Sequence, residues 1–112
     1  MERRGAASIV HSAIAATATS SAIDMGQFPA LYVQVDLGAT GTPNWTITVQ
    51  GCATEGGTYV ALTDTANNAM STGALTADAG WTFIGCPRYT KVVATENSGT
   101  GTCTVTVVPI SV

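Results

Sequence analysis

Two stretches in which apolar and polar residues strictly alternate constrain this chain more than any other feature. They are residues 31–37 (LYVQVDL) and 44–50 (NWTITVQ). Successive side chains of a β-strand point to opposite faces, so each stretch predicts a strand with one apolar face. The two apolar rows are Leu31, Val33, Val35 and Leu37 in the first stretch and Trp45, Ile47 and Val49 in the second.

The segment between these strands, residues 38–43 (GATGTP), is rich in turn-forming residues. It predicts that the two strands form a hairpin. A hairpin with one apolar face needs a second layer to cover that face. We expect the rest of the chain to supply this layer.

Further short strands are predicted at regular intervals after the first two. Gly and Pro separate them, and no stretch has a convincing helical period. The loop at 96–101 contains two glycines and predicts a closing hairpin, while Pro109 is expected to end regular pairing or to mark an edge. The sequence therefore predicts an all-β fold, an antiparallel β-sandwich or barrel of about seven or eight short strands. The further strands are expected at 58–63, 70–75, 81–84, 88–95 and 102–108.

Residues 1–29 differ from the predicted sandwich domain at 30–112. After Arg3 and Arg4, the stretch 5–22 is almost wholly Ala, Ser, Thr and Ile. Its apolar run is interrupted by polar residues, so we expect no signal peptide. We expect an extended N-terminal arm, with a first strand at 14–20 as one option. An arm so poor in charge would be disordered alone, so we expect a neighbouring subunit to hold it.

Charged residues make up only 10% of the chain, against about 25% in typical soluble domains. A weakly charged surface is poorly defended against association, which favours a subunit packed against other subunits over an isolated domain. The net charge is −3 with four Lys and Arg. We expect no nucleic-acid partner, because the basic footprint is missing. We expect no membrane partner, because no apolar run approaches the roughly 20 residues that span a bilayer.

The residues give little support to catalysis. His11 is the single histidine, and the nearest carboxylate in sequence is Glu2. Aspartates in predicted turns usually bond to nearby backbone, so we expect no enzyme, no cofactor and no metal site. The odd number of cysteines favours reduced thiols, although a Cys52–Cys86 or Cys86–Cys103 bridge stays open.

Several of these segments resemble small structural proteins of tailed bacteriophages. A strand ending in VQG, followed by a Gly-rich turn and an aromatic residue, matches that pattern, although Cys52-Ala53-Thr54 replaces the usual Ser-Asn-Asp. The resemblance covers roughly residues 30–108. Its segments are VQVD at 33–36, GTP at 41–43, TITVQG at 46–51, GGTY at 56–59, RYTKVV at 88–93 and the strand at 102–107.

The resemblance implies a capsid decoration, or cement, protein. Such a protein is made in the host cytoplasm, lies on the outer surface of the virion and staples neighbouring major capsid proteins. It often forms a homo-trimer, sometimes a dimer. We expect the N-terminal arm to contact the shell or another subunit, and a strand edge to serve oligomer contacts. The candidate contact residues are Arg3, Arg4, Ile9, Val10, Ile14, Arg88 and Lys91.

The alternative is a carbohydrate- or receptor-binding module of a phage tail or head fibre. That function needs an exposed aromatic residue beside Asn or Asp side chains, for which Asn67, Asn68 and Trp81 are the candidates. Aromatic residues on strands are more often core residues than sugar platforms.

Overall fold

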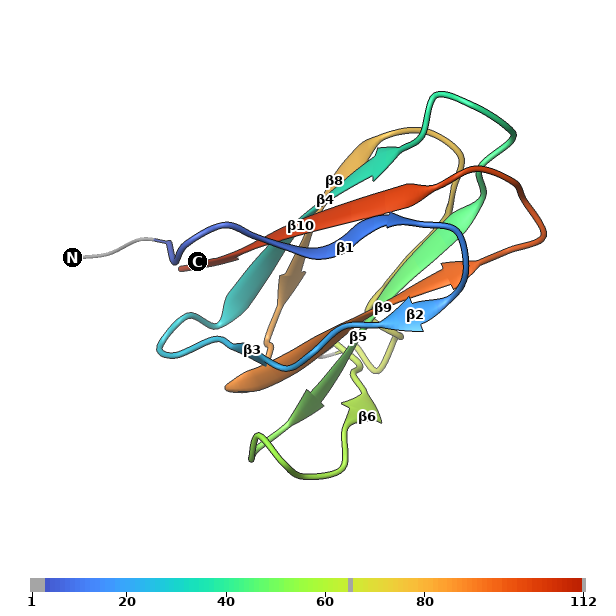
Figure 1. Cartoon of the computed structure of the whole chain (residues 1–112). Helices are drawn as coiled ribbons and strands as arrows, with labels where there is room; N and C mark the ends of the chain where they lie inside the picture. The colour runs from blue at the N-terminus through green and yellow to red at the C-terminus, as the bar shows by residue number, and fades with distance from the viewer. Residues whose placement is uncertain (1–3, 65, 112) are drawn as a thin grey trace.

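The computed structural model describes residues 4–64 and 66–111 of the chain, and in them it confirms the predicted all-β fold. Two antiparallel sheets lie face to face, as Figure 1 shows. The described residues contain ten strands, several of them only two residues long, and no helix. Accordingly, no helix in this part of the chain could span a membrane.

The first sheet contains four strands. Its central pair, β4 and β10, is in continuous register from the Leu37–Cys103 pair to the Ala30–Ile110 pair. The outer strands β1 and β8 pair with β10 and β4, respectively. In order across the sheet, the strands are β1 (Ser8–Ile14), β10 (Cys103–Ile110), β4 (Ala30–Leu37) and β8 (Ala79–Ile84).

The second sheet is built around β5 and β9, which pair over their full lengths. Short strands flank this pair: β2 and β3 both pair with β9, while β6 and β7 both pair with β5. The strands of this sheet are β2 (Ala18–Thr19), β3 (Ile23–Asp24), β5 (Trp45–Cys52), β6 (Val60–Ala61), β7 (Ser71–Leu75) and β9 (Tyr89–Glu96).

The core lies between the sheets and has the composition that the alternating pattern predicts. Inward-facing residues of the long strands are fully buried, while most of their sequence neighbours are partly exposed. The period of two thus identified the buried faces of β4 and β5 correctly. The fully buried side chains include Leu31, Val33, Val35, Trp45, Ile47, Val49, Val92, Val105 and Val107.

Both predicted hairpins are wrong. β4 and β5 lie in different sheets, and so do β9 and β10. Their loops cross between the sheets and bond to each other instead, through Asn97 N–Asn44 O (2.8 Å), Thr100 N–Thr42 O (3.0 Å) and Gly38 N–Thr102 O (2.9 Å). Sheets in a sandwich lie about 10 Å apart, a gap that a six-residue loop can cross. Alternation shows which face of a strand is buried, but it does not show which strand lies beside it.

The described part of residues 1–29 is built into the sandwich. β1 pairs with β10 in one sheet, and β2 and β3 pair with β9 in the other. The first strand is Ser8–Ile14, earlier in the chain than the 14–20 stretch considered from the sequence. In this structure the chain's own domain holds the segment, whereas the sequence led us to expect a neighbouring subunit in that role.

Pro109 neither ends pairing nor lies on an edge strand, contrary to the prediction. It lies in β10, the strand between β1 and β4, opposite Leu31. Its carbonyl accepts a hydrogen bond from Gly5 N (2.6 Å), on the side away from β4. Because the N and C=O of one strand residue point to the same side, the missing N–H of proline costs no bond to β4.

Candidate interaction surfaces

The predicted contact residues lie in two places. Arg3 is outside the described residues. Arg4 is exposed, and its backbone forms an isolated antiparallel β-bridge with Ile110. Ile9 on β1 is 63% exposed. Val10 and Ile14, also on β1, pack partly against the core. The structure therefore leaves Arg4 and Ile9 as the outward residues of this group.

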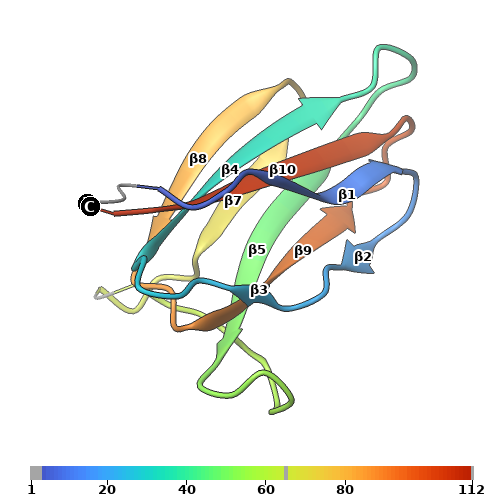
Figure 2. The ribbon, with the colours of Figure 1, turned by 60° about the vertical axis from the view of Figure 1, so that its left-hand side comes forward.

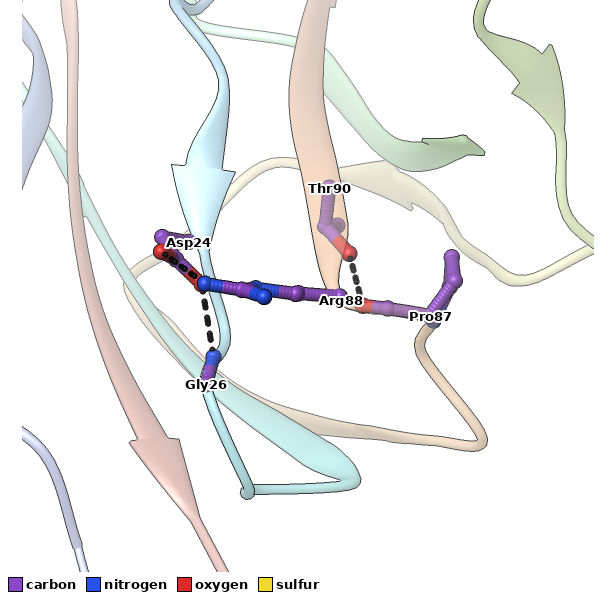
Figure 3. A network of polar contacts seen from close by, with 5 residues as sticks. All are labelled: Asp24, Gly26, Pro87, Arg88 and Thr90. Carbon is purple, nitrogen blue, oxygen red and sulfur yellow. Dashed lines mark hydrogen bonds and ion pairs between the residues drawn. The ribbon is translucent and has the colours of Figure 1, made fainter. Parts of the chain in front are cut away.

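Arg88 lies just before β9 and binds Asp24, the last residue of β3. Figure 3 shows the Arg88 side chain reaching the Asp24 carboxylate. Arg88 Nε lies 3.1 Å from Asp24 Oδ1, and Nη2 lies 3.3 Å from Oδ2. The backbone N–H of Gly26 donates a third bond to Asp24 Oδ1 at 2.9 Å. These bonds, led by the one from Arg88, lower the pKa of the Asp24 carboxyl.

Arg88, just before β9, and Lys91, within it, each lie over a tyrosine ring. We call these four residues the Tyr–cation patch: Tyr59, Arg88, Tyr89 and Lys91. Lys91 Nζ is 4.3 Å from the centroid of the Tyr59 ring, and Arg88 Cζ is 5.2 Å from that of Tyr89. Tyr59 OH donates to Glu55 O at 2.8 Å, which fixes the ring. Arg and Tyr are enriched at the centres of protein interfaces, so the patch has the composition of a partner-binding surface.

A hollow of about 550 Å³ opens between the N-terminal segment and β3, and we call it the N-terminal hollow. Asp24 lies on it, so the Asp24–Arg88 pair joins the hollow to the Tyr–cation patch. Ile9 lines the hollow and is largely exposed. The fold thus places Ile9, from the N-terminal segment, on the same hollow as Asp24, the partner of Arg88. Sequence separation gave no signal for this proximity.

A second hollow, of about 390 Å³, lies beside β8 and contains Trp81, which is 39% exposed. Asp64, from the loop that carries Asn67 and Asn68, also lines it. The Asp64 carboxylate accepts bonds from Ala66 N (2.9 Å) and Asn68 N (3.0 Å). As predicted for an aspartate in a turn, this carboxylate holds its own loop.

His11 is buried and takes part in joining the two sheets. Its Nε2 atom donates to Val92 O at 3.0 Å, from β1 in one sheet to β9 in the other. Within the described residues, this hydrogen bond goes to a backbone carbonyl and not to a carboxylate. His11 therefore has a structural role, because this contact joins the two sheets.

The three cysteines are free thiols in the structure. Burial raises the pKa of Cys86 and of Cys103 to about 11. Cys52 is half-exposed at the end of β5, and a hydrogen bond from the Thr54 backbone lowers its pKa. Within residues 4–64 and 66–111, no group of three or more His, Cys, Asp and Glu is placed to hold a metal ion.

Comparison with known proteins finds a similar solved structure but no match in sequence. No protein-family model matches the chain, and no curated protein matches it in sequence. The crystal structure of the SPBc2 prophage-derived protein YomS is similar with a TM-score of 0.63 and 22% sequence identity. The match covers 99% of this chain and 97% of that chain. The two proteins therefore share a fold from end to end.

Sequence reasoning identified Arg88 and Lys91 as candidate residues but missed their partners. Tyr59 lies 32 positions before Lys91, in the loop just before β6. Asp24 is one of the aspartates expected in a turn, and its bond from Gly26 N agrees with that, but its bond to Arg88 spans 64 positions. Long-range pairs of this kind depend on strand topology, which the sequence pattern left undetermined.

Proposed function

We propose that this chain is a structural protein of a tailed bacteriophage and that it decorates the outside of the capsid by binding the major capsid protein. The observation that carries the proposal is the end-to-end fold likeness to a prophage-derived protein. The sparse charge and the resemblance of residues 30–108 to phage structural proteins support it further. The protein acts on the outer surface of the virion, as a homo-trimer or a dimer, after synthesis in the host cytoplasm.

The shell-binding surface in this proposal combines the exposed residues of the N-terminal segment with the Tyr–cation patch. Arg4 and Ile9 contribute from one side, and Arg88 and Lys91 from the other. Arg88 forms an ion pair with Asp24, whose side chain is 50% exposed. Because exposed ion pairs are weak, an acidic group of the capsid can compete with Asp24 for Arg88. A ligand that binds only the assembled shell stabilises that shell by mass action, and many copies acting together make weak contacts sufficient.

The test is to mix the purified protein with heads that lack it. We expect binding to saturate at a fixed copy number and to raise the temperature at which heads rupture. Ile9→Asp should weaken binding at least tenfold, because it places a charge on an exposed apolar contact. Ala77→Asp, an equal charge change in an exposed turn, is the matched control. A protein that does not bind heads would exclude this function. An equal loss of head binding in both variants would exclude this surface.

The alternative function, a receptor- or carbohydrate-binding module, has one observation in its favour. Trp81 and Asp64 line the same hollow, an aromatic residue beside a polar loop. Trp81→Ala should then abolish cell or glycan binding and leave head binding unchanged. Head binding by the wild-type protein, with no binding to cells or glycans, would favour decoration.

A further inference from the structure

The outer edge of β8 is the one long, regular strand edge without a partner among the described residues. β8 pairs with β4 through six consecutive positions, from Ala30–Ile84 to Val35–Ala79, without a register shift. Figure 2 shows β8 at one margin of its sheet and β1 at the other. Every second residue of such an edge directs its N–H and C=O outward, where a further strand can bind them.

The other edges carry the features that protect natural sheets from pairing. β1 has register shifts on both sides of His11, and Ala13 has a positive φ of 46°. β7 has a shift against β5 and a positive φ of 70° at Gly73. β2, β3 and β6 are two residues long. Bulged or very short edges are poor templates for a further strand, and β8 has neither protection.

The side chains of β8 also lack the charges that usually keep edges apart. The strand reads AGWTFI, and it exposes Ile84 by 60% and Trp81 by 39%. Asp36 and Asp78 lie near the Ala79 end of the strand, where they line a hollow with Gly80, and Asp36 accepts a hydrogen bond from Gln34 Nε2 at 3.5 Å. Asp78 accepts from Leu37 N at 2.7 Å, toward β4, and Asp64 accepts bonds within its own loop. A chain of net charge −3 therefore presents an uncharged, apolar edge here.

We propose that the β8 edge binds the β8 edge of a second copy of this chain, antiparallel about a twofold axis. A second copy supplies a strand of equal length, with no charge to repel the first, and its outward N–H and C=O groups meet their complements. The pairing joins two four-stranded sheets into one continuous sheet. The proposed function leaves a trimer or a dimer open, and this pairing selects the dimer. The dimer forms without a capsid, so it can be tested independently of capsid binding.

A twofold axis normal to the sheet keeps the inner faces of the two copies on one side. Residues of like orientation must then pair across the axis. With the axis at Thr82, Thr82 stands opposite its own copy, Trp81 opposite Phe83, and Gly80 opposite Ile84. Thr–Thr and aromatic pairs are favourable across antiparallel strands. In this arrangement Trp81 packs beside Phe83 of the second copy, and Ile84 lies beside its Gly80.

The test compares Thr82→Lys with Thr58→Lys in sedimentation and native mass spectrometry over a dilution series, without heads. Each variant adds one lysine at an exposed threonine. The two therefore differ only in where the charge lies, at the β8 edge or away from it. We expect wild type and Thr58→Lys to be dimers. Thr82→Lys should dissociate with a dimer Kd raised roughly a hundredfold or more, because two like charges meet at the axis. Thermal unfolding of each variant verifies that it folds.

A covalent test does not depend on the stability of the lysine variant. In a Cys52→Ser background, Thr82→Cys places two thiols opposite each other, at a separation of about 4.5–5.5 Å between Cα atoms that a disulfide can span. Mild oxidation should give a covalent dimer for Thr82→Cys and not for Thr58→Cys. A wild-type monomer or trimer, a dimer that survives Thr82→Lys, or equal cross-linking at both positions would overturn the proposal. Head binding by monomeric Thr82→Lys would leave the decoration function standing.

Discussion

Cys52 differs from the other two thiols in what surrounds its sulfur. It lies at the end of β5 with its Sγ 3.8 Å from Thr54 Oγ1, and the Thr54 backbone stabilises the thiolate. Cys103 is wholly buried in β10, and Cys86 is 9% exposed, with its Sγ 3.7 Å from Phe83 O. Burial in apolar surroundings disfavours the thiolate, which is the reactive form.

We predict that one thiol of the folded protein reacts quickly with a disulfide reagent at pH 8 and that two react only after unfolding. A pKa of about 11 leaves roughly a thousandth of Cys86 and Cys103 ionised at that pH. A chromogenic thiol assay with and without denaturant counts both classes. Cys52→Ser should remove the fast phase, and a fast phase that persists in this variant would contradict the assignment.

The Asp24–Arg88 pair predicts a dependence of stability on pH. Because the folded-state pKa of Asp24 lies below its ordinary value, ionised Asp24 stabilises the fold above about pH 4, and this contribution is lost as the pH falls through the folded pKa. The gap in Tm between wild type and Asp24→Asn should be widest near neutral pH and close in acid. Both side chains are at least half exposed, so the gap should be small and shrink in high salt. A gap that is constant from pH 7 to pH 3 would refute this origin.

At the scale of strands, the sequence determined burial but not neighbours. The alternation in β4 and β5 identified their inward residues correctly. Any antiparallel partner with an apolar row satisfies the same pattern, so β4 with β5 and β4 with β10 were equally consistent with it. The β8 edge and the Tyr–cation patch follow from the pairing that was realised. They could not be predicted until the partner of each strand was known.

The two crossing loops provide a test of this pairing. A Cβ on Gly99 would lie 2.5 Å from Thr42 O and 2.8 Å from Asn44 N, both of them backbone atoms that cannot turn away. We predict that Gly99→Ala destabilises the fold by about 1–3 kcal/mol, measured by urea unfolding. Gly56→Ala, where nothing lies within 4 Å, should change stability by less than about 0.5 kcal/mol. If the strands paired as hairpins, the two loops would not meet and Gly99→Ala would be as mild as the control.

At the scale of the molecule, the N-terminal segment joins the two sheets. β1 belongs to the sheet of β10, while Thr17 and Ser20 bond to β9 in the other sheet. Ser20 N donates to Val92 O at 2.9 Å, and Ser20 Oγ accepts from Val92 N at 2.9 Å. His11 reaches the same carbonyl from β1 at 3.0 Å. A segment fixed at both layers should unfold together with the domain.

We therefore predict that deletion of residues 1–14 lowers the Tm by roughly 10 °C or more, because it removes β1, its bonds to β10 and the packing of Val10 and Ile14, a loss of several kcal/mol. Thermal unfolding followed by circular dichroism measures this, and Ile9→Asp, which changes an exposed side chain and keeps the strand, should melt near wild type. An unchanged Tm after deletion would mean that the segment is a separable arm, free to bind the shell or another subunit. If the Tm falls as predicted, loss of head binding by the truncated chain reports unfolding, and the shell contact must be judged from Ile9→Asp instead.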